Sequence, residues 1–176
     1  MLFKKTKIKD VYIIELEEKV DDRGYNARVY SLDQIRKYAK DFSIEQINRV
    51  MTLRKGIIRG IHMQKDPMSE DKLVQCIKGS IFDVVVDLRR DSKTYGESIG
   101  EEISSENNKM ILLPKGCAHG FQTLKNNTIV QYAVSQCYSP SHELGLRWND
   151  PMLKIEWPIK KLIVSKKDAS WPNFPL

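Results

Sequence analysis

The chain has 176 residues, a length that fits one domain, and its hydrophobic fraction of 41% is typical of a globular protein. A charged fraction of 30%, without any apolar run near the ~20 residues that cross a bilayer, argues against a membrane partner. The formal charge of +6 favours an anionic partner such as a diphosphate. Because no nucleic-acid-binding helix or aromatic stacking signature accompanies it, we expect no nucleic-acid partner.

The N-terminal part of the chain predicts a strand and one short helix. A basic segment, Met1 to Lys7, is followed by alternating apolar and charged residues instead of a signal-peptide core, so we expect a cytoplasmic protein. A strand is expected from Asp10 to Leu16. Apolar residues at helical spacing then predict a helix from Leu32 to Lys40, with Ser31 as its N-cap.

The middle of the chain reads as short strands separated by turns, which is typical of a β-sandwich or barrel. Residues 73–77 and 81–88 flank a Lys-Gly-Ser turn and predict a hairpin, and residues 120–124 and 128–134 predict a second one. Residues 81–88 alternate between an apolar face and a face that mixes apolar residues with Asp83 and Asp87.

The remaining segments complete a β-rich chain. Residues 111–113 predict a strand that ends at Pro114, and the proline-rich tail after Trp148 is expected to wrap the surface with short helical turns. No repeats or low-complexity segments interrupt the pattern. We therefore expect a single β-rich domain over residues 1–176.

The cysteines do not indicate a disulfide framework or a zinc site. Cys76, Cys117 and Cys137 are three in number, widely separated and without a Cys-x-x-Cys pair, so we interpret them as reduced thiols. Cys117 lies near His119, but a separation of two residues on a strand only makes both side chains point the same way. A cysteine nucleophile is therefore disfavoured.

Several short motifs occur in one order along nearly the whole chain. They are Arg59-Gly60-Ile61-His62-Met63-Gln64, Lys72-Leu73-Val74, Asp83 to Arg89, Ser92 to Gly96, Pro114 to Phe121, Tyr138-Ser139-Pro140, Glu143, Trp148-Asn149-Asp150 and Lys166 to Ala169. In this order and spacing the chain resembles the dTDP-4-dehydrorhamnose 3,5-epimerase family. The resemblance implies an all-β, cupin-like jelly-roll barrel with a few short peripheral helices. It also implies a homodimer that acts on a nucleotide-linked 4-keto-6-deoxyhexose without a cofactor.

Many cupins bind a metal through two histidines separated by one residue, together with a later carboxylate. In this chain Gln64 stands where the second histidine would be, and the sequence holds only His62, His119 and His142. We therefore expect no catalytic metal.

Epimerisation next to a ketone needs a base, an acid on the opposite face, a group that stabilises the enolate charge and residues that bind the diphosphate. His62 is the candidate base, because an imidazole titrates near ~6.5. The resemblance gives Asp168 as its partner and Tyr132 as the acid, with Tyr138 as a nearby alternative. A structural histidine and a core tyrosine are the competing interpretations.

Lys72 matches the family's lysine. A cation near the C4 oxygen of the sugar would stabilise the negative charge of the enolate as it develops. A surface lysine is the alternative. Asp83 is expected to orient Lys72 or His119. The positions that match substrate-binding residues of the family are Arg23, Gln46, Asn48, Arg59, His119, Glu143 and Lys167; arginine suits a diphosphate because it donates in pairs.

The match fails after Asp22-Arg23-Gly24. The family usually continues with aromatics and a glutamate that contacts the nucleotide, whereas this chain places Arg28 there, as a candidate substrate contact. The leading hypothesis is therefore inversion of C3 and/or C5 of a nucleoside-diphosphate 4-keto-6-deoxy sugar, dTDP-linked or linked to GDP or another nucleotide. A 3,4-ketoisomerase and a non-catalytic sugar-nucleotide or nucleic-acid binding barrel are the alternatives.

Overall fold

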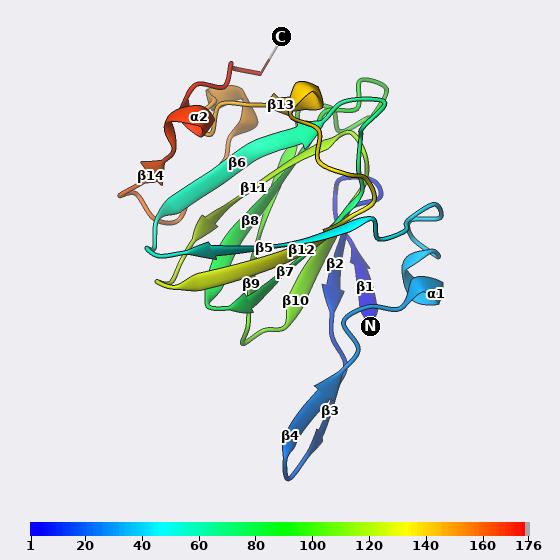
Figure 1. Ribbon diagram of the computed structural model, residues 1–176. Helices are drawn as coiled ribbons and strands as arrows, with labels where there is room; N and C mark the ends of the chain where they lie inside the picture. The colour runs from blue at the N-terminus through cyan, green and yellow to red at the C-terminus, as the bar shows by residue number, and fades with distance from the viewer. Residues whose placement is uncertain (175–176) are drawn as a thin grey trace.

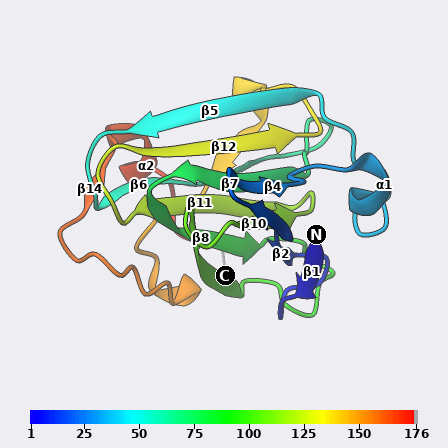
Figure 2. The ribbon, with the colours of Figure 1, turned by 90° about the horizontal axis from the view of Figure 1, so that it is seen from below.

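The computed structural model describes residues 1–174, so Pro175 and Leu176, the end of the expected domain, lie outside the described residues. Two antiparallel sheets face each other (Figures 1 and 2). The strands of the first sheet are, in order, β1 (Leu2–Lys5), β2 (Tyr12–Glu15), β10 (Lys109–Leu113), β7 (Lys72–Lys78), β12 (Thr128–Val134) and β5 (Gln46–Thr52). Those of the second are β13 (Glu143–Gly145), β6 (Ile57–Gln64), β11 (Cys117–Thr123), β8 (Ser80–Asp87) and β9 (Ser98–Ser104), with β14 (Ile163–Val164) parallel to β6.

The remaining elements are small. A two-stranded hairpin of β3 (Glu18–Asp21) and β4 (Gly24–Ala27) projects from the barrel, and the helices are α1 (Leu32–Ile35), α2 (Lys166–Ala169) and the 3-10 turns Pro140–His142 and Pro151–Leu153 (Figure 1). This arrangement confirms the predicted all-β, cupin-like jelly roll with short peripheral helices. Within residues 1–174 no helix has the length and apolar character needed to span a membrane.

Both predicted hairpins are wrong, although their strands exist. β7 pairs with β10 and β12, whereas β8 pairs with β9 and β11, so the turn at Gly79 carries the chain from one sheet to the other. The turn between β11 and β12 makes the same crossing. Turn residues specify that the chain reverses, but strand partners are selected by the faces that must be buried, and both faces of β8 are covered.

The predicted helix is also shorter than expected. α1 ends at Ile35, and Ser31 occupies its N-cap position without a side-chain hydrogen bond. Beyond it the backbone N–H groups of Tyr38 and Ala39 both donate to Ile35, which makes a tight turn. Ile35 and Phe42 are buried together, so the chain turns to bury both instead of extending the helix to Lys40.

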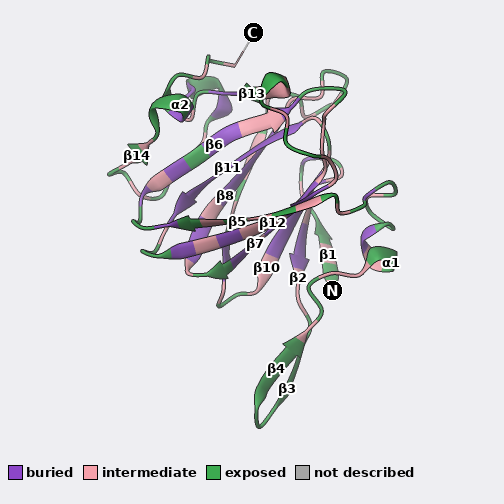
Figure 3. Cartoon of the chain, viewed as in Figure 1, coloured by how far each residue is buried: buried purple, intermediate pink, exposed green. Residues whose placement is uncertain are grey.

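The core accounts for the alternating pattern of β8. The interior between the sheets is filled by residues of both, among them Ile13, Val74, Ile81, Val85, Ile111, Phe121 and Val130. The other face of β8 presents Val84 and Val86 to the C-terminal segment, where Leu153 and Trp157 cover them. Figure 3 shows the resulting contrast between buried barrel strands and the exposed hairpin β3–β4.

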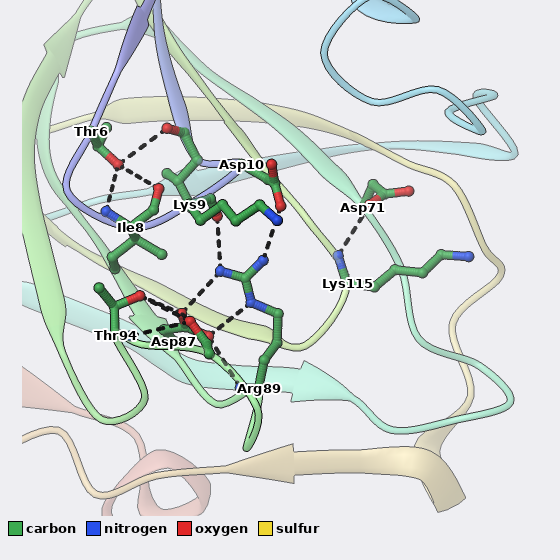
Figure 4. A network of polar contacts seen from close by, with 11 residues as sticks. Thr6, Ile8, Lys9, Asp10, Asp71, Asp87, Arg89, Thr94 and Lys115 are labelled. Carbon is green, nitrogen blue, oxygen red and sulfur yellow. Dashed lines mark hydrogen bonds and ion pairs between the residues drawn. The ribbon is translucent and has the colours of Figure 1, made fainter.

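The acidic position at the end of β8 has a structural use. Asp87 is fully buried and accepts hydrogen bonds from Arg89 Nε at 2.9 Å, Ser92 Oγ at 2.6 Å and Thr94 Oγ1 at 2.7 Å (Figure 4). Burial alone would raise the pKa of Asp87, but these hydrogen bonds lower it to about 2. Arg89 also donates to the carbonyl of Lys9, so the network fastens the N-terminal segment to the barrel.

Candidate active site

A cavity lies between the two sheets and has two adjoining compartments, which share His62, Lys72 and Tyr132. The first compartment, of about 460 Å³, is also lined by Val50, Ile57, Ile58, Arg59, His119, Phe121, Ile163, Val164, Ser165, Lys167 and Asp168. The second, of about 290 Å³, is also lined by Gln46, Asn48, Met63, Gln64, Glu70, Val134, Tyr138 and Glu143. Most of the predicted site residues therefore meet in one place, and Tyr132 faces it from the sheet opposite His62.

A β-bulge allows two residues of one motif to line this cavity. Arg59 and His62 are an odd number of residues apart on β6, so a regular strand would place them on opposite faces. The register with β11 shifts between these two positions, which inserts an extra residue into β6. Gly60 occupies the bulge with φ of +102°, and a Cβ there would lie 2.6 Å from the carbonyl oxygen of His119. Glycine is therefore required at this point of the motif.

The surroundings of His62 favour its neutral form. Burial, followed by the positive charge of Lys72, lowers the pKa of His62 to about 3, against the opposing charge of Glu143. The Nδ1 atom of His62 lies 4.0 Å from Oε1 of Glu143. A neutral imidazole that lines a cavity has a lone pair available to accept a proton.

This shift gives a testable titration. We expect the His62 ring to stay neutral between about pH 4.5 and pH 8 in an NMR titration, where an unperturbed histidine would protonate. Because an unfolded chain protonates at 6.5 and the folded one only near 3, His62 should also reduce folding stability as the pH falls below 6.5. Lys72→Met removes a cation and should raise the pKa of His62. A wild-type midpoint at or above 6.5 would contradict the assignment.

The predicted contact between His62 and Asp168 is not present. Asp168 lines the first compartment, but its carboxylate accepts a hydrogen bond from Ser165 Oγ at 2.9 Å, and Ser165 Oγ accepts one from its backbone N–H at 3.0 Å. No ion pair or hydrogen bond joins it to His62 in the part of the chain that is described. Ser165 is the N-cap of α2, and the carboxylate of Asp168 accepts the hydrogen bond of its capping hydroxyl. Glu143, expected only to bind substrate, lies beside His62 instead.

Two tyrosines that the sequence did not separate have different surroundings. Tyr138 donates its hydroxyl to Glu143 Oε2 at 3.0 Å, and Lys167 Nζ lies 2.5 Å from the same oxygen. Burial would raise the pKa of Glu143, but these two hydrogen bonds hold it below its ordinary value. The hydroxyl of Tyr132 forms no hydrogen bond within residues 1–174, and burial raises its pKa. Tyr132 is therefore the protonated hydroxyl that faces the cavity with its proton available.

The other polar residues of the cavity lie in fixed pairs. Lys72 is the first residue of β7 and lies 2.9 Å from Glu70, with only 7% of its side chain exposed, so it is not a surface lysine. Buried Asp83 lies 2.8 Å from His119 Nε2, and burial chiefly raises its pKa; it contacts His119 and not Lys72. Nothing in the sequence pattern had indicated Glu70, which lies in the loop before β7.

Two predicted substrate residues lie outside the cavity of their own chain. Arg23 is at the tip of the hairpin β3–β4, where its guanidinium lies 2.6 Å from Asp21, and Arg28 follows β4 directly; both are exposed. The hairpin points away from the barrel in Figure 1. By contrast Gln46 and Asn48 lie on the interior face of β5, joined by a hydrogen bond of 2.7 Å.

Potential metal ligands are not clustered in the described part of the chain. Over residues 1–174 there is no group of three or more His, Cys, Asp or Glu side chains placed to bind an ion. Gln64, at the position of a cupin ligand, donates its amide to Met68, Glu70 and Cys137.

Comparison with known proteins gives one consistent result. Residues 5–175 match the family model for dTDP-4-dehydrorhamnose 3,5-epimerase. The chain is 39% identical to the enzyme of that name from Sinorhizobium fredii, over 98% of this chain and 89% of the relative. The crystal structure of the Elizabethkingia anophelis enzyme superposes with a TM-score of 0.95 at 36% identity, covering 99% of this chain and 96% of that one. The Bacillus anthracis enzyme, with TDP and pyrophosphate bound, gives 0.93 at 39% identity, covering 98% and 100%.

Proposed function

The chain belongs to the dTDP-4-dehydrorhamnose 3,5-epimerase family, and from this premise we propose that it inverts C3 and C5 of a dTDP-linked 4-keto-6-deoxy sugar through an enolate. The observation that carries the proposal is the cavity in which His62 and Tyr132 come from opposite sheets. Such a pair can act on the two faces of one sugar ring.

The proposed reaction begins at His62. Its neutral imidazole removes the proton from the carbon next to the C4 ketone, and the electron pair moves to the ketone oxygen to form an enolate. The ammonium group of Lys72 stabilises that oxygen, because its charge meets a negative charge that develops only along the reaction path. Tyr132 then donates its hydroxyl proton to the opposite face of the same carbon. Solvent restores the proton of Tyr132 and removes that of His62 before the second centre reacts.

We assign binding of the diphosphate to cationic residues of the first compartment. Arg59 and Lys167 line it from two different elements, and His119 is held in place by Asp83. A guanidinium and an ammonium group suit the paired oxygens of a diphosphate. Binding of TDP and pyrophosphate by the Bacillus anthracis relative supports this choice of ligand.

The proposed assembly contains two copies of the chain. Support comes from the hairpin β3–β4, whose Val20 and Tyr25 are 75% and 56% exposed although both are apolar. Packing of the hairpin on a partner chain would bury these side chains and carry Arg23 and Arg28 to the partner's cavity. We therefore propose a homodimer. Sedimentation equilibrium that gave the mass of one chain at micromolar concentration would exclude it.

Arg28 stands where the family usually has a glutamate that contacts the nucleotide, so the preference for the dTDP-linked sugar needs a direct test. We propose a panel of dTDP-, GDP-, UDP- and CDP-linked 4-keto-6-deoxy sugars in deuterated water, with the position of the label read by NMR. The expected result is label at C3 and C5 of the dTDP sugar together with inverted products. Label at one position would indicate a single-centre epimerase, and a moved carbonyl would indicate a 3,4-ketoisomerase. Binding without exchange on any substrate would contradict catalysis.

A further inference from the structure

Glu70 forms a buried ion pair with the lysine of the cavity. Its Oε1 lies 2.9 Å from Nζ of Lys72, and the two side chains are only 8% and 7% exposed. Both line the second compartment beside His62 and Tyr132. A buried ion pair pays a desolvation penalty that can exceed its attraction, so it is weak as a device for stability. Its place beside the reacting groups points to a use in the site itself.

The second carboxylate oxygen of Glu70 is fixed by a hydrogen bond from a neighbouring side chain. Oε2 accepts a hydrogen bond of 3.0 Å from the Nε2 of Gln64, and the same amide also donates to the carbonyls of Met68 and Cys137. The oxygen of the Gln64 side chain accepts from the backbone N–H of Ser139. One carboxylate oxygen is thus anchored to the protein frame, and the other faces Lys72.

The loop that carries Glu70 is fastened on its other side as well. The next residue, Asp71, donates its backbone N–H to Ser135 Oγ at 2.8 Å. The carboxylate of Asp71 accepts a hydrogen bond from the backbone N–H of Lys115 at 3.0 Å (Figure 4). Its carbonyl accepts from the N–H of Ser135. Ser135 directly follows β12, and Lys115 lies in the turn between β10 and β11, so these contacts fix the loop of Glu70 relative to the neighbouring strands.

The charge of Glu70 also reaches the proposed acid. Burial is the main cause that raises the pKa of Tyr132, and the negative charge of Glu70 is the next. The positive charge of Lys72 in turn lowers the pKa of His62. One member of the ion pair therefore acts on the proposed acid and the other on the proposed base, in the compartment that all four residues line.

We propose that Glu70 is a positioning residue, whose anchored carboxylate holds the ammonium group of Lys72 in the cavity as the contact for the C4 oxygen of the substrate. A side chain as flexible as lysine stabilises an oxyanion well only if it is oriented before the charge develops. The inference rests on the proposed function, since it concerns the same reaction.

Glu70→Gln tests the inference, because it keeps the size of the side chain and removes its charge. We expect kcat for epimerisation to fall by about 10- to 100-fold, as is usual for partners that orient a reacting group, with a smaller change in KM. The alkaline limb of the kcat profile should move to lower pH, because loss of this charge lowers the pKa of Tyr132. Glu70→Asp should recover part of the activity.

Glu101→Gln is the control. Glu101 forms a more exposed ion pair with Lys109, with an Nζ–Oε1 distance of 2.5 Å, and neither residue lines the cavity. It should leave kcat and the pH profile unchanged. Thermal unfolding and dTDP binding of each variant would report on folding. If Glu70→Gln folds poorly, Glu70→Asp alone should still lower kcat, because the shorter side chain no longer reaches Lys72 in the same way, while the alkaline limb stays near its wild-type position because the charge is kept.

A double-mutant cycle separates positioning from a merely structural role. If Glu70 acts through Lys72, then Glu70→Gln should change kcat by less than about 3-fold in a Lys72→Met background. Independent, multiplying effects would overturn the inference, as would a Glu70→Gln variant indistinguishable from Glu101→Gln. If the wild type itself showed no exchange, the proposed function would fail instead.

Discussion

His62→Ala is expected to lower kcat by about 10³-fold or more, the upper part of the range for loss of a general base. Deuterium incorporation should fall at C3 and at C5 together, because one histidine is proposed to serve both centres. The variant should still bind dTDP within a few-fold of the wild type, since the proposed diphosphate contacts Arg59 and Lys167 are unchanged. The measurement is solvent-deuterium exchange followed by NMR at each carbon.

His142→Ala is the control for this variant. His142 lies outside the cavity, where its Nδ1 is 2.7 Å from Ser139 Oγ, and its removal should leave exchange intact. Unchanged exchange in His62→Ala would rule out the proposed base. Loss of exchange at one carbon only would show that a second group removes the other proton.

The sequence predicted the class of fold and the membership of most of the cavity, but not how strands pair. Alternation in residues 81–88 indicated one apolar face and one face that mixes apolar residues with Asp83 and Asp87. The structure buries both faces, and the two carboxylates have specific hydrogen-bonding partners. The turns at Gly79 and at 125–127 were correctly placed but wrongly interpreted as hairpins. A turn is a local property, whereas the choice of partner depends on apolar faces far apart in the chain.

Contacts within the site were harder to predict than its members. Period-two alternation places Arg59 and His62 on opposite faces, and only the isolated Gly60 signals a bulge that brings them together. Asp168 lines the cavity, but its carboxylate accepts a hydrogen bond from Ser165, the N-cap of α2. Glu70 lies in a loop without periodicity, so only the folded chain reveals its pairing with Lys72.

The position of the hairpin β3–β4 explains why Arg23 and Arg28 do not line the cavity with the other predicted site residues. Arg23 was assigned from a motif, and Arg28 from the position where the family usually has a glutamate. Neither assignment says which copy of a chain the residue serves. Their exposure on a projecting hairpin is compatible with a substrate role only in an assembly.

Tyr132→Phe should separate proton removal from inversion. With His62 intact, the enolate can still form and regain a solvent proton on the face from which it was lost, so deuterium should enter C3 and C5 without inversion. Product formation should fall by about 10²-fold or more, because loss of a general acid removes the step on the opposite face. NMR distinguishes labelled substrate from labelled product.

Tyr138→Phe is the matched variant, since the Tyr138 hydroxyl is already donated to Glu143 at 3.0 Å. It should retain inversion, with a modest effect through the weaker support of Glu143 beside His62. The opposite outcome, inversion lost in Tyr138→Phe and kept in Tyr132→Phe, would transfer the role of acid to Tyr138. In that event Glu143 would have to release the Tyr138 hydroxyl in each cycle, and its hydrogen bonds to Tyr138 and Lys167 would become part of the reaction.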